Sequence, residues 1–142
     1  MSFFLHGYHV RANGIRLHLL RYGGQGPRML LLPGITSPAI TWGFVAERLA
    51  RHFDVHVLDF RGRGLSSSVP GMDASLDAMA VDVLDLLKVQ GWSSVTLLGQ
   101  ANKTVFDGVC RSAGDRVVTK GEIAAFRIFY SNNNVWGPFV EK

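Results

Sequence analysis

The sequence contains a single cysteine, Cys110, among its 142 residues. One cysteine cannot form an intrachain disulfide, and it argues against a cysteine-based zinc site. Long apolar runs are also missing, since none approaches the roughly 20 residues that a membrane-spanning helix needs. Residues 1–6 hold only a short apolar patch, with no basic leader and no cleavage site of a signal peptide. These absences favour a protein of the cytoplasm that has no metal site and no membrane partner.

Charged residues are scarce as well, at 18% of the chain, whereas hydrophobic residues make up 47%. Such a composition can bury enough apolar surface to fold, which excludes an intrinsically disordered protein. The net charge is +4, and the basic residues are scattered singly along the chain. This pattern lacks the clustered positive charge of a nucleic-acid-binding protein, so we expect no nucleic-acid partner.

The first two thirds of the sequence alternate strand and helix patterns. Residues 10–22 predict a hairpin, because Asn13-Gly14 is a strong signal for a two-residue turn. Short apolar runs predict buried strands at residues 29–32, 54–59 and 95–99, and helical spacing predicts helices at 42–53 and from Asp73 or Ser75 to Gln90. Strands that alternate with helices predict a parallel, helix-covered α/β sheet, here preceded by an antiparallel hairpin.

The pattern changes after Gly99. Residues 116–119 and 122–130 predict two strands, and a turn at 132–134 leads into a further strand at 135–140. No helix of the earlier kind is predicted, so we expect an antiparallel β-meander. We therefore divide the chain into residues 1–99 and an unrelated β-rich tail of residues 100–142.

Two loops carry a resemblance to a known family. Residues 33–42 follow one predicted buried strand, and residues 61–68 (sequence RGRGLSSS) follow the next. In order and spacing, residues 8–99 resemble the N-terminal half of an α/β-hydrolase. The two loops are most similar to those of deformylases that hydrolyse the formyl amide N-formylmaleamate to maleamate and formate in bacterial nicotinate degradation. The tail resembles no family that we recognise.

The resemblance implies a truncated α/β-hydrolase sheet followed by a short β-rich tail, a small-molecule amide substrate and no cofactor. It places one oxyanion-hole donor at the N–H of Ile35, because Gly34 lets the backbone turn toward a cleft. Gly34, Thr36 and Trp42 are the candidate substrate-binding residues, with a core position as the alternative for Trp42. Residues 59–66 are implied to be structural, and a phosphate-binding loop is disfavoured because its lysine is missing.

The catalytic residues of that family are not completed in the sequence. A nucleophile elbow, Gly-x-Ser-x-Gly, should follow the strand at 95–99, but Ala101 occupies the nucleophile position. All five histidines precede residue 57, whereas the family places its triad histidine last. We interpret them as structural or exposed, and expect neither His18 nor His56 to face the carboxyl ends of the strands. Cys110 has no neighbouring histidine to activate it.

Three functions remain open. The first is a hydrolase-derived chain, truncated and chimeric through fusion or recombination, that is inactive alone. The second is an amide or ester hydrolase that uses an unrecognised nucleophile or a complementing chain. The third is a non-catalytic module whose tail strands add to the sheet edge of a partner. A sheet that stops at its fifth strand exposes apolar surface around Leu97 and Leu98 unless the tail or a second copy covers it, so we expect self-association.

Overall fold

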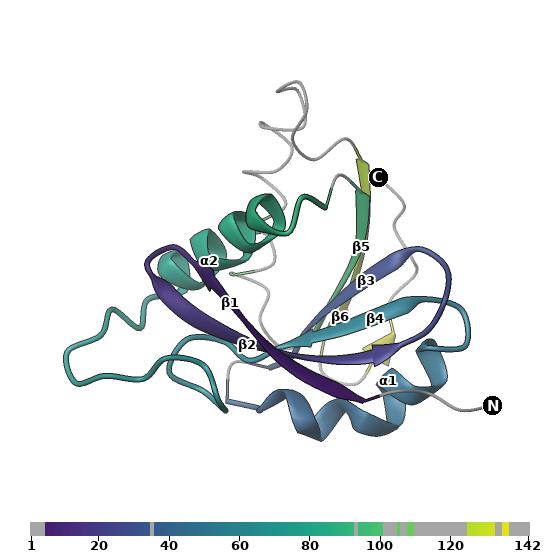
Figure 1. Ribbon diagram of the computed structural model, residues 1–142, viewed down its shortest axis with the longest axis horizontal. Coiled ribbons are helices and arrows are strands. Elements are labelled where there is room, and N and C mark those ends of the chain that lie inside the picture. The colour runs from purple at the N-terminus through teal and green to yellow at the C-terminus, as the bar shows by residue number, and fades with distance from the viewer. Residues whose placement is uncertain are drawn as a thin grey trace.

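The fold was analysed in a computed structural model, which describes residues 5–34, 36–92, 94–100, 105, 108–109, 125–132 and 135–136. The described residues form a seven-stranded sheet in the order β1-β2-β4-β3-β5-β6-β7 (Figure 1). The strands are β1 (His6–Ala12), β2 (Ile15–Gly23), β3 (Arg28–Leu32), β4 (Asp54–Leu58), β5 (Ser94–Gln100), β6 (Ala125–Asn132) and β7 (Val135–Trp136). The helices are the 3-10 helix η1 (Ala39–Trp42), α1 (Gly43–Leu49) and α2 (Leu76–Val89).

The N-terminal hairpin forms as the sequence predicts. Asn13 and Gly14 connect β1 to β2 with φ angles of 50° and 74°. A two-residue turn of this kind needs positive φ at both positions, which asparagine and glycine tolerate. β2 then pairs antiparallel with β4, while β3 lies parallel to both β4 and β5. The predicted hairpin and parallel sheet are therefore confirmed.

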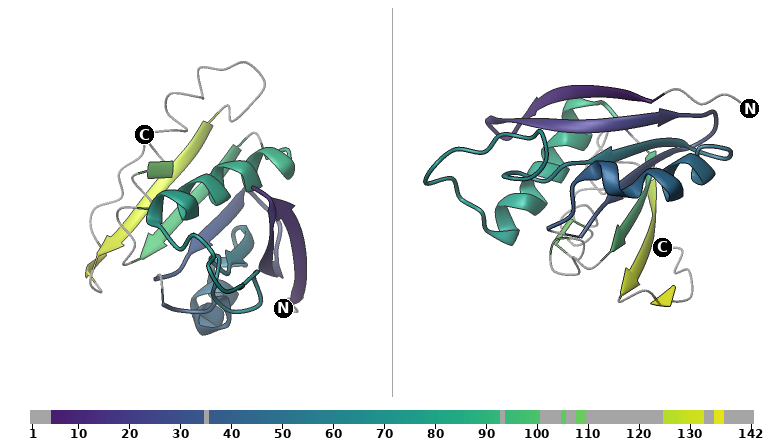
Figure 2. Two further views of the ribbon diagram at one scale, coloured as in Figure 1. Left: turned by 90° about the vertical axis from the view of Figure 1, so that its left-hand side faces the viewer. Right: turned by 90° about the horizontal axis from the view of Figure 1, so that it is seen from below.

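Helices cover both faces of the sheet. Figure 2 shows α2 on one face, with η1 and α1 on the other. Successive residues of β3 alternate between the two cores: Leu30 and Leu32 pack on the α2 face, and Leu31 on the α1 face. The Ser75 side chain caps α2 by accepting a hydrogen bond from the N–H of Ala78 at 3.1 Å. This hydrogen bond confirms Ser75 as the cap. The burial of β3 on both faces explains why its sequence is a continuous apolar run.

The tail joins the sheet in a way that the sequence pattern did not predict. β6 runs parallel to β5 over the whole length of β5, so the expected all-antiparallel meander is wrong for this strand. The hairpin from β6 to β7 across the predicted turn is confirmed. Side-chain alternation predicts a strand but not its direction, because parallel and antiparallel strands have the same period of two. The predicted strand at 116–119 lies outside the described residues.

A helical segment between β5 and β6 was also missed. Val105, Gly108 and Val109 are helical, and both valines are fully buried in the core on the α2 face. An added Cβ at Gly108 would lie 3.2 Å from the Cβ of Ala80, so this segment packs closely against α2. Because β5 is paired with β6 and Leu97 and Leu98 are buried, the apolar surface expected to lie open at β5 is covered.

Candidate functional site

The carboxyl ends of β3 and β4 meet at one edge of the sheet, where ligands bind in open α/β sheets. β3 leads into Pro33 and Gly34, which are both buried. The N–H of Ser37 donates a hydrogen bond to the carbonyl of Gly34 at 2.8 Å and closes a turn in which Thr36 is exposed. Ile35 and Ala101 lie outside the described residues, so the oxyanion donor and the nucleophile position remain predictions.

Trp42, the other predicted substrate-binding residue, ends the helix η1. Its side chain is half-buried and packs against the apolar cluster on the α1 face, which includes Leu31 and Tyr22. The neighbouring side chains of Ile40 and Phe44 are 59% and 85% exposed. Trp42 therefore has the core contacts of the alternative interpretation, while part of its side chain stays accessible beside an exposed apolar surface.

Asp59 follows β4 and joins three segments at this edge. Its Oδ1 accepts a hydrogen bond from the N–H of Ala39 at 2.7 Å, which anchors the start of η1. Its Oδ2 accepts one from the N–H of Leu65 at 3.2 Å and lies 2.8 Å from Nδ1 of His18. Because Asp59 is buried and these contacts use both carboxylate oxygens, the geometry supports a structural role for this residue.

The loop after Asp59 folds around its carboxylate. Gly64 has a φ of +49°, and a Cβ at this position would overlap the carboxylate of Asp59. The hydroxyl of Ser66 donates to the carbonyl of Asp59 at 2.6 Å and accepts from the N–H of His18 at 2.8 Å. The serine and glycines of this loop thus build a turn around Asp59, as the family resemblance implies.

Arg61 connects the same loop to α2. Its guanidinium forms two hydrogen bonds with the carboxylate of Asp82, both at 2.6 Å. A third bond, at 2.9 Å, reaches the carbonyl of Asp73. Asp82 is fully buried, and hydrogen bonding to it raises the pKa of Arg61. The guanidinium is thus committed to contacts within the protein, which is inconsistent with a phosphate-binding role.

Two of the five histidines are buried, and one of them is not where the sequence predicted. His18 lies beside Asp59 at the carboxyl end of β4, because the hydrogen bond from the N–H of Asp59 to the carbonyl of His18 brings β2 to that edge. Its Nε2 faces β1, where a Cβ on Gly7 would lie 3.0 Å away. His18 is therefore a satisfied structural histidine, as expected, although its expected position was wrong.

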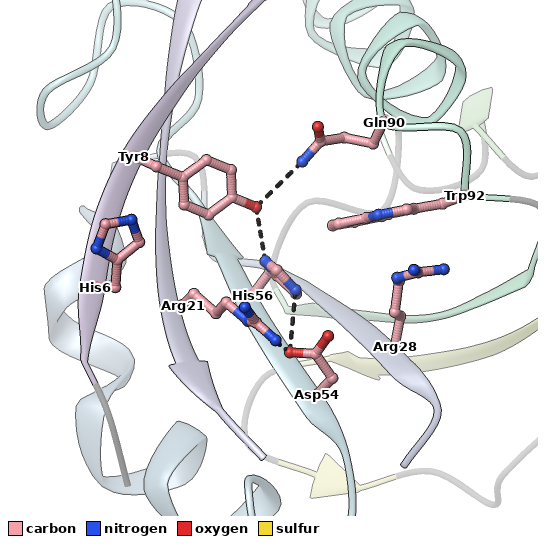
Figure 3. A pocket seen from close by; sticks show the side chains of 8 residues that line it. All are labelled: His6, Tyr8, Arg21, Arg28, Asp54, His56, Gln90 and Trp92. Atoms are coloured by element: carbon pink, nitrogen blue, oxygen red, sulfur yellow. Dashed lines mark hydrogen bonds and ion pairs between the residues drawn. The ribbon is translucent and has the colours of Figure 1, made fainter. Parts of the chain in front are cut away.

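Two cavities that are lined by described residues lie at the opposite, amino edge of the parallel strands. One cavity of about 410 Å³ (Figure 3) is lined by His6, Tyr8, Arg21, Arg28, Asp54, His56, Gln90 and Trp92. The sequence analysis missed this group. A signal was available in β4, where the polar Asp54 and His56 alternate with Val55 and Val57 and so share one face of a strand.

Some kinds of site find no support in the described part of the chain. No three histidine, cysteine, aspartate or glutamate side chains gather there as a potential metal site. Among the same residues, no helix has both the length and the apolar character to cross a membrane.

The arrangement of strands and helices is that of the α/β-hydrolases. No family profile matches the chain. The structure superposes on an epoxide hydrolase from Vigna radiata with a TM-score of 0.70, covering 87% of this chain and 38% of that one, at 21% identity. The described residues therefore have the fold of the α/β-hydrolases.

Within this class, the N-terminal part of the chain matches N-formylmaleamate deformylase. The chain is 58% identical to the Pseudomonas putida KT2440 enzyme over 101 residues, which cover 71% of this chain and 38% of the relative. A variant of the N-formylmaleamic acid deformylase from Pseudomonas putida S16 superposes with a TM-score of 0.74 and 46% identity, covering 88% of this chain and 46% of that chain. The chain thus spans less than half the length of these relatives.

Proposed function

We propose that the chain derives from enzymes that deformylate N-formylmaleamate, with residues 1–99 corresponding to the N-terminal half of such a hydrolase, and that it is inactive alone. The observation that carries the proposal is Ala101, which follows β5 directly where such an enzyme would place its serine. In the ancestral reaction, a serine oxygen would attack the formyl carbon and the amide nitrogen would leave in maleamate. Water would then release formate. The methyl group of alanine cannot form the acyl-enzyme.

The general base of that reaction has no candidate in the sequence order of the family. Residues 57–142 contain no histidine. Among the buried histidines, the His18 ring contacts Asp59 and faces β1, and the His56 ring contacts Tyr8 near the amino edge. Neither ring is placed to accept a proton at the carboxyl end of β5. The proposal therefore rests on the missing base as well as on the missing nucleophile.

What the chain retains is the scaffold of the oxyanion side. Asp59 anchors the beginning of η1, and η1 follows the loop that holds Gly34 and Thr36. The proposed donor, the N–H of Ile35, lies within this loop. We propose Gly34, Thr36 and Trp42 as the residues that would contact the substrate, a small amide, in an active ancestor.

The test is release of formate from N-formylmaleamate by the purified chain, with its intact mass verified. Three proteins are compared: the chain itself, Ala101→Ser, and Ala74→Ser as a control in an exposed loop. We expect no release above buffer from any of them. Catalysed release by the unchanged chain would overturn the proposal. Release by Ala101→Ser, with none by the other two proteins, would show that residue 101 is the nucleophile position. It would also refute the claim that the chain lacks a general base.

A further inference from the structure

The cavity at the amino edge lies beside the core on the α2 face. Strand residues spaced by two share one face, so Tyr8 lies on the same side of β1 as the core residue Val10. By the same spacing Arg28 shares the face of Leu30 in β3, and His56 that of Leu58 in β4. This face is apolar beneath α2 and becomes polar where α2 ends at Val89, next to Gln90 and Trp92.

Hydrogen bonds in the cavity determine which nitrogen of His56 carries the proton. The amide of Gln90 donates to the Tyr8 hydroxyl at 3.3 Å, and that hydroxyl lies 2.6 Å from Nδ1 of His56 (Figure 3). Burial raises the pKa of Tyr8, so its hydroxyl keeps its proton. We assign Nδ1 of His56 as the acceptor of that hydroxyl, because a carboxylate oxygen of Asp54 lies beside Nε2 and favours a proton there. Burial also lowers the pKa of His56, which is therefore neutral at pH 7 and carries its proton on Nε2.

The Nε2–H of His56 is a buried donor that meets no acceptor with good hydrogen-bond geometry among the described residues. The residue is 5% exposed, and its hydrogen-bonding capacity at Nε2 is not filled by those residues. Oδ1 of Asp54 lies 3.2 Å away, which makes it a close charge contact. An unmet buried donor costs free energy, and a ligand oxygen that reaches it recovers that cost.

The charges around this donor favour an anion. Asp54 is neutralised by Arg21, whose Nε donates to Oδ1 of Asp54 at 2.9 Å. Arg28 forms no ion pair with a described side chain, and its guanidinium lies over the ring of Trp92, 5.6 Å from the centroid. The cavity is therefore lined by one arginine without an ion pair among the described side chains and by one neutral N–H donor, and both residues contact the ring of Trp92.

We propose that this cavity is a binding site for a small carboxylate, held by the guanidinium of Arg28 and the Nε2–H of His56. A planar carboxylate matches the donors of a guanidinium, and the volume of about 410 Å³ admits a chain of a few carbon atoms. Asp54 disfavours a dianion such as phosphate, because its carboxylate lies beside the donor of His56. The site is distinct from the carboxyl edge and does not depend on the proposed hydrolase reaction.

The test uses the full chain and butyrate, followed at the indole N–H of Trp92 in ¹H–¹⁵N correlation spectra. We expect a saturable shift of this signal with butyrate and none with butyramide, which has similar shape but no charge. Arg28→Gln should weaken binding by about tenfold or more, because it removes a charge-assisted hydrogen bond. Arg11→Gln removes the same charge from an exposed position of β1 outside the cavity and should leave the affinity unchanged.

The proposal is overturned by the lack of a saturable shift with butyrate, by equal binding of butyramide, or by an unchanged affinity in Arg28→Gln. Tighter binding of inorganic phosphate than of butyrate would refute a carboxylate as the ligand. Circular dichroism of both arginine variants verifies that a lost signal reflects binding and not unfolding.

Discussion

The carboxylate of Asp59 fills the space beside Gly64, whose φ of +49° is unfavourable for alanine and for most other residues with a side chain. We expect Gly64→Ala to lower the free energy of unfolding by about 2–4 kcal/mol, the sum of left-handed strain and steric overlap. Urea denaturation followed by circular dichroism measures this change.

The matched control is Gly62→Ala in the same loop. Gly62 also has a positive φ, +73°, but an added Cβ there would meet no atom within 4 Å. It should cost only about 1 kcal/mol, because only the backbone strain remains. Equal costs for the two variants would show that the carboxylate of Asp59 does not restrict Gly64.

The buried imidazole of His56 predicts a dependence of stability on pH. Burial lowers its pKa below the ordinary value of 6.5, and the nearby Asp54 opposes part of that shift. The unfolded chain then binds a proton more readily than the folded one, so stability falls as the pH falls below about 6.5. The cavity groups that face His56 are Tyr8, Asp54, Arg21 and Arg28.

Urea denaturation at pH 7, 6 and 5 measures this effect. We expect His56→Gln to flatten the decrease between pH 7 and pH 5, because the titrating group is gone. His52→Gln, at an exposed position, should retain the slope of the unchanged chain. An identical slope in both variants would assign the pH dependence to other groups.

At the scale of elements, the pair of Arg61 and Asp82 joins the loop after β4 to α2. Among the described side chains, Arg61→Met would leave the buried carboxylate of Asp82 with the amide of Asn13 as its one remaining partner, which donates to it at 2.8 Å. We expect a loss of about 3–5 kcal/mol in the free energy of unfolding, because an uncompensated buried charge is costly. Chemical denaturation gives the value.

The double variant Arg61→Met with Asp82→Leu separates the charge from the packing. It removes both charges, so it should be more stable than Arg61→Met alone. If the double variant is less stable than the single one, the carboxylate of Asp82 is not the source of the cost.

At the scale of the whole molecule, the far end of the sheet carries an incompletely paired strand. Within the described chain, β7 pairs with Ser131 and Asn132 of β6 alone. Residues 125–130 of β6 therefore pair with β5 on one side and have no described strand on the other. Unpaired backbone groups of an edge strand can pair with another copy. The self-association that we expected at β5 is therefore proposed at β6.

Light scattering after size-exclusion chromatography tests this at several protein concentrations. We expect a mass above that of the 15.6 kDa monomer that rises with concentration. A constant monomer mass over the range would contradict self-association. A different protein bound at this edge would instead support the interaction-module alternative, and deleting residues 104–142 should abolish that binding.

Local patterns were sufficient for several parts of the fold and the site. The hairpin followed from Asn13 and Gly14, and the start of α2 followed from Ser75, because turns and caps depend on residues a few positions apart. The contact of His18 with Asp59 joins residues 41 positions apart. It depends on strand register, which no local pattern contains.

By itself, the sequence determined the order of strands and helices, the alanine at position 101 and the position of every histidine before residue 57. These are properties of residue type and spacing, and they decide which catalytic groups the chain can supply. Only the tertiary structure decided that β6 lies parallel to β5 and that His56 meets Arg28 in one cavity. Both depend on which segments pack together, and packing is set by the burial and hydrogen bonding of the whole sheet.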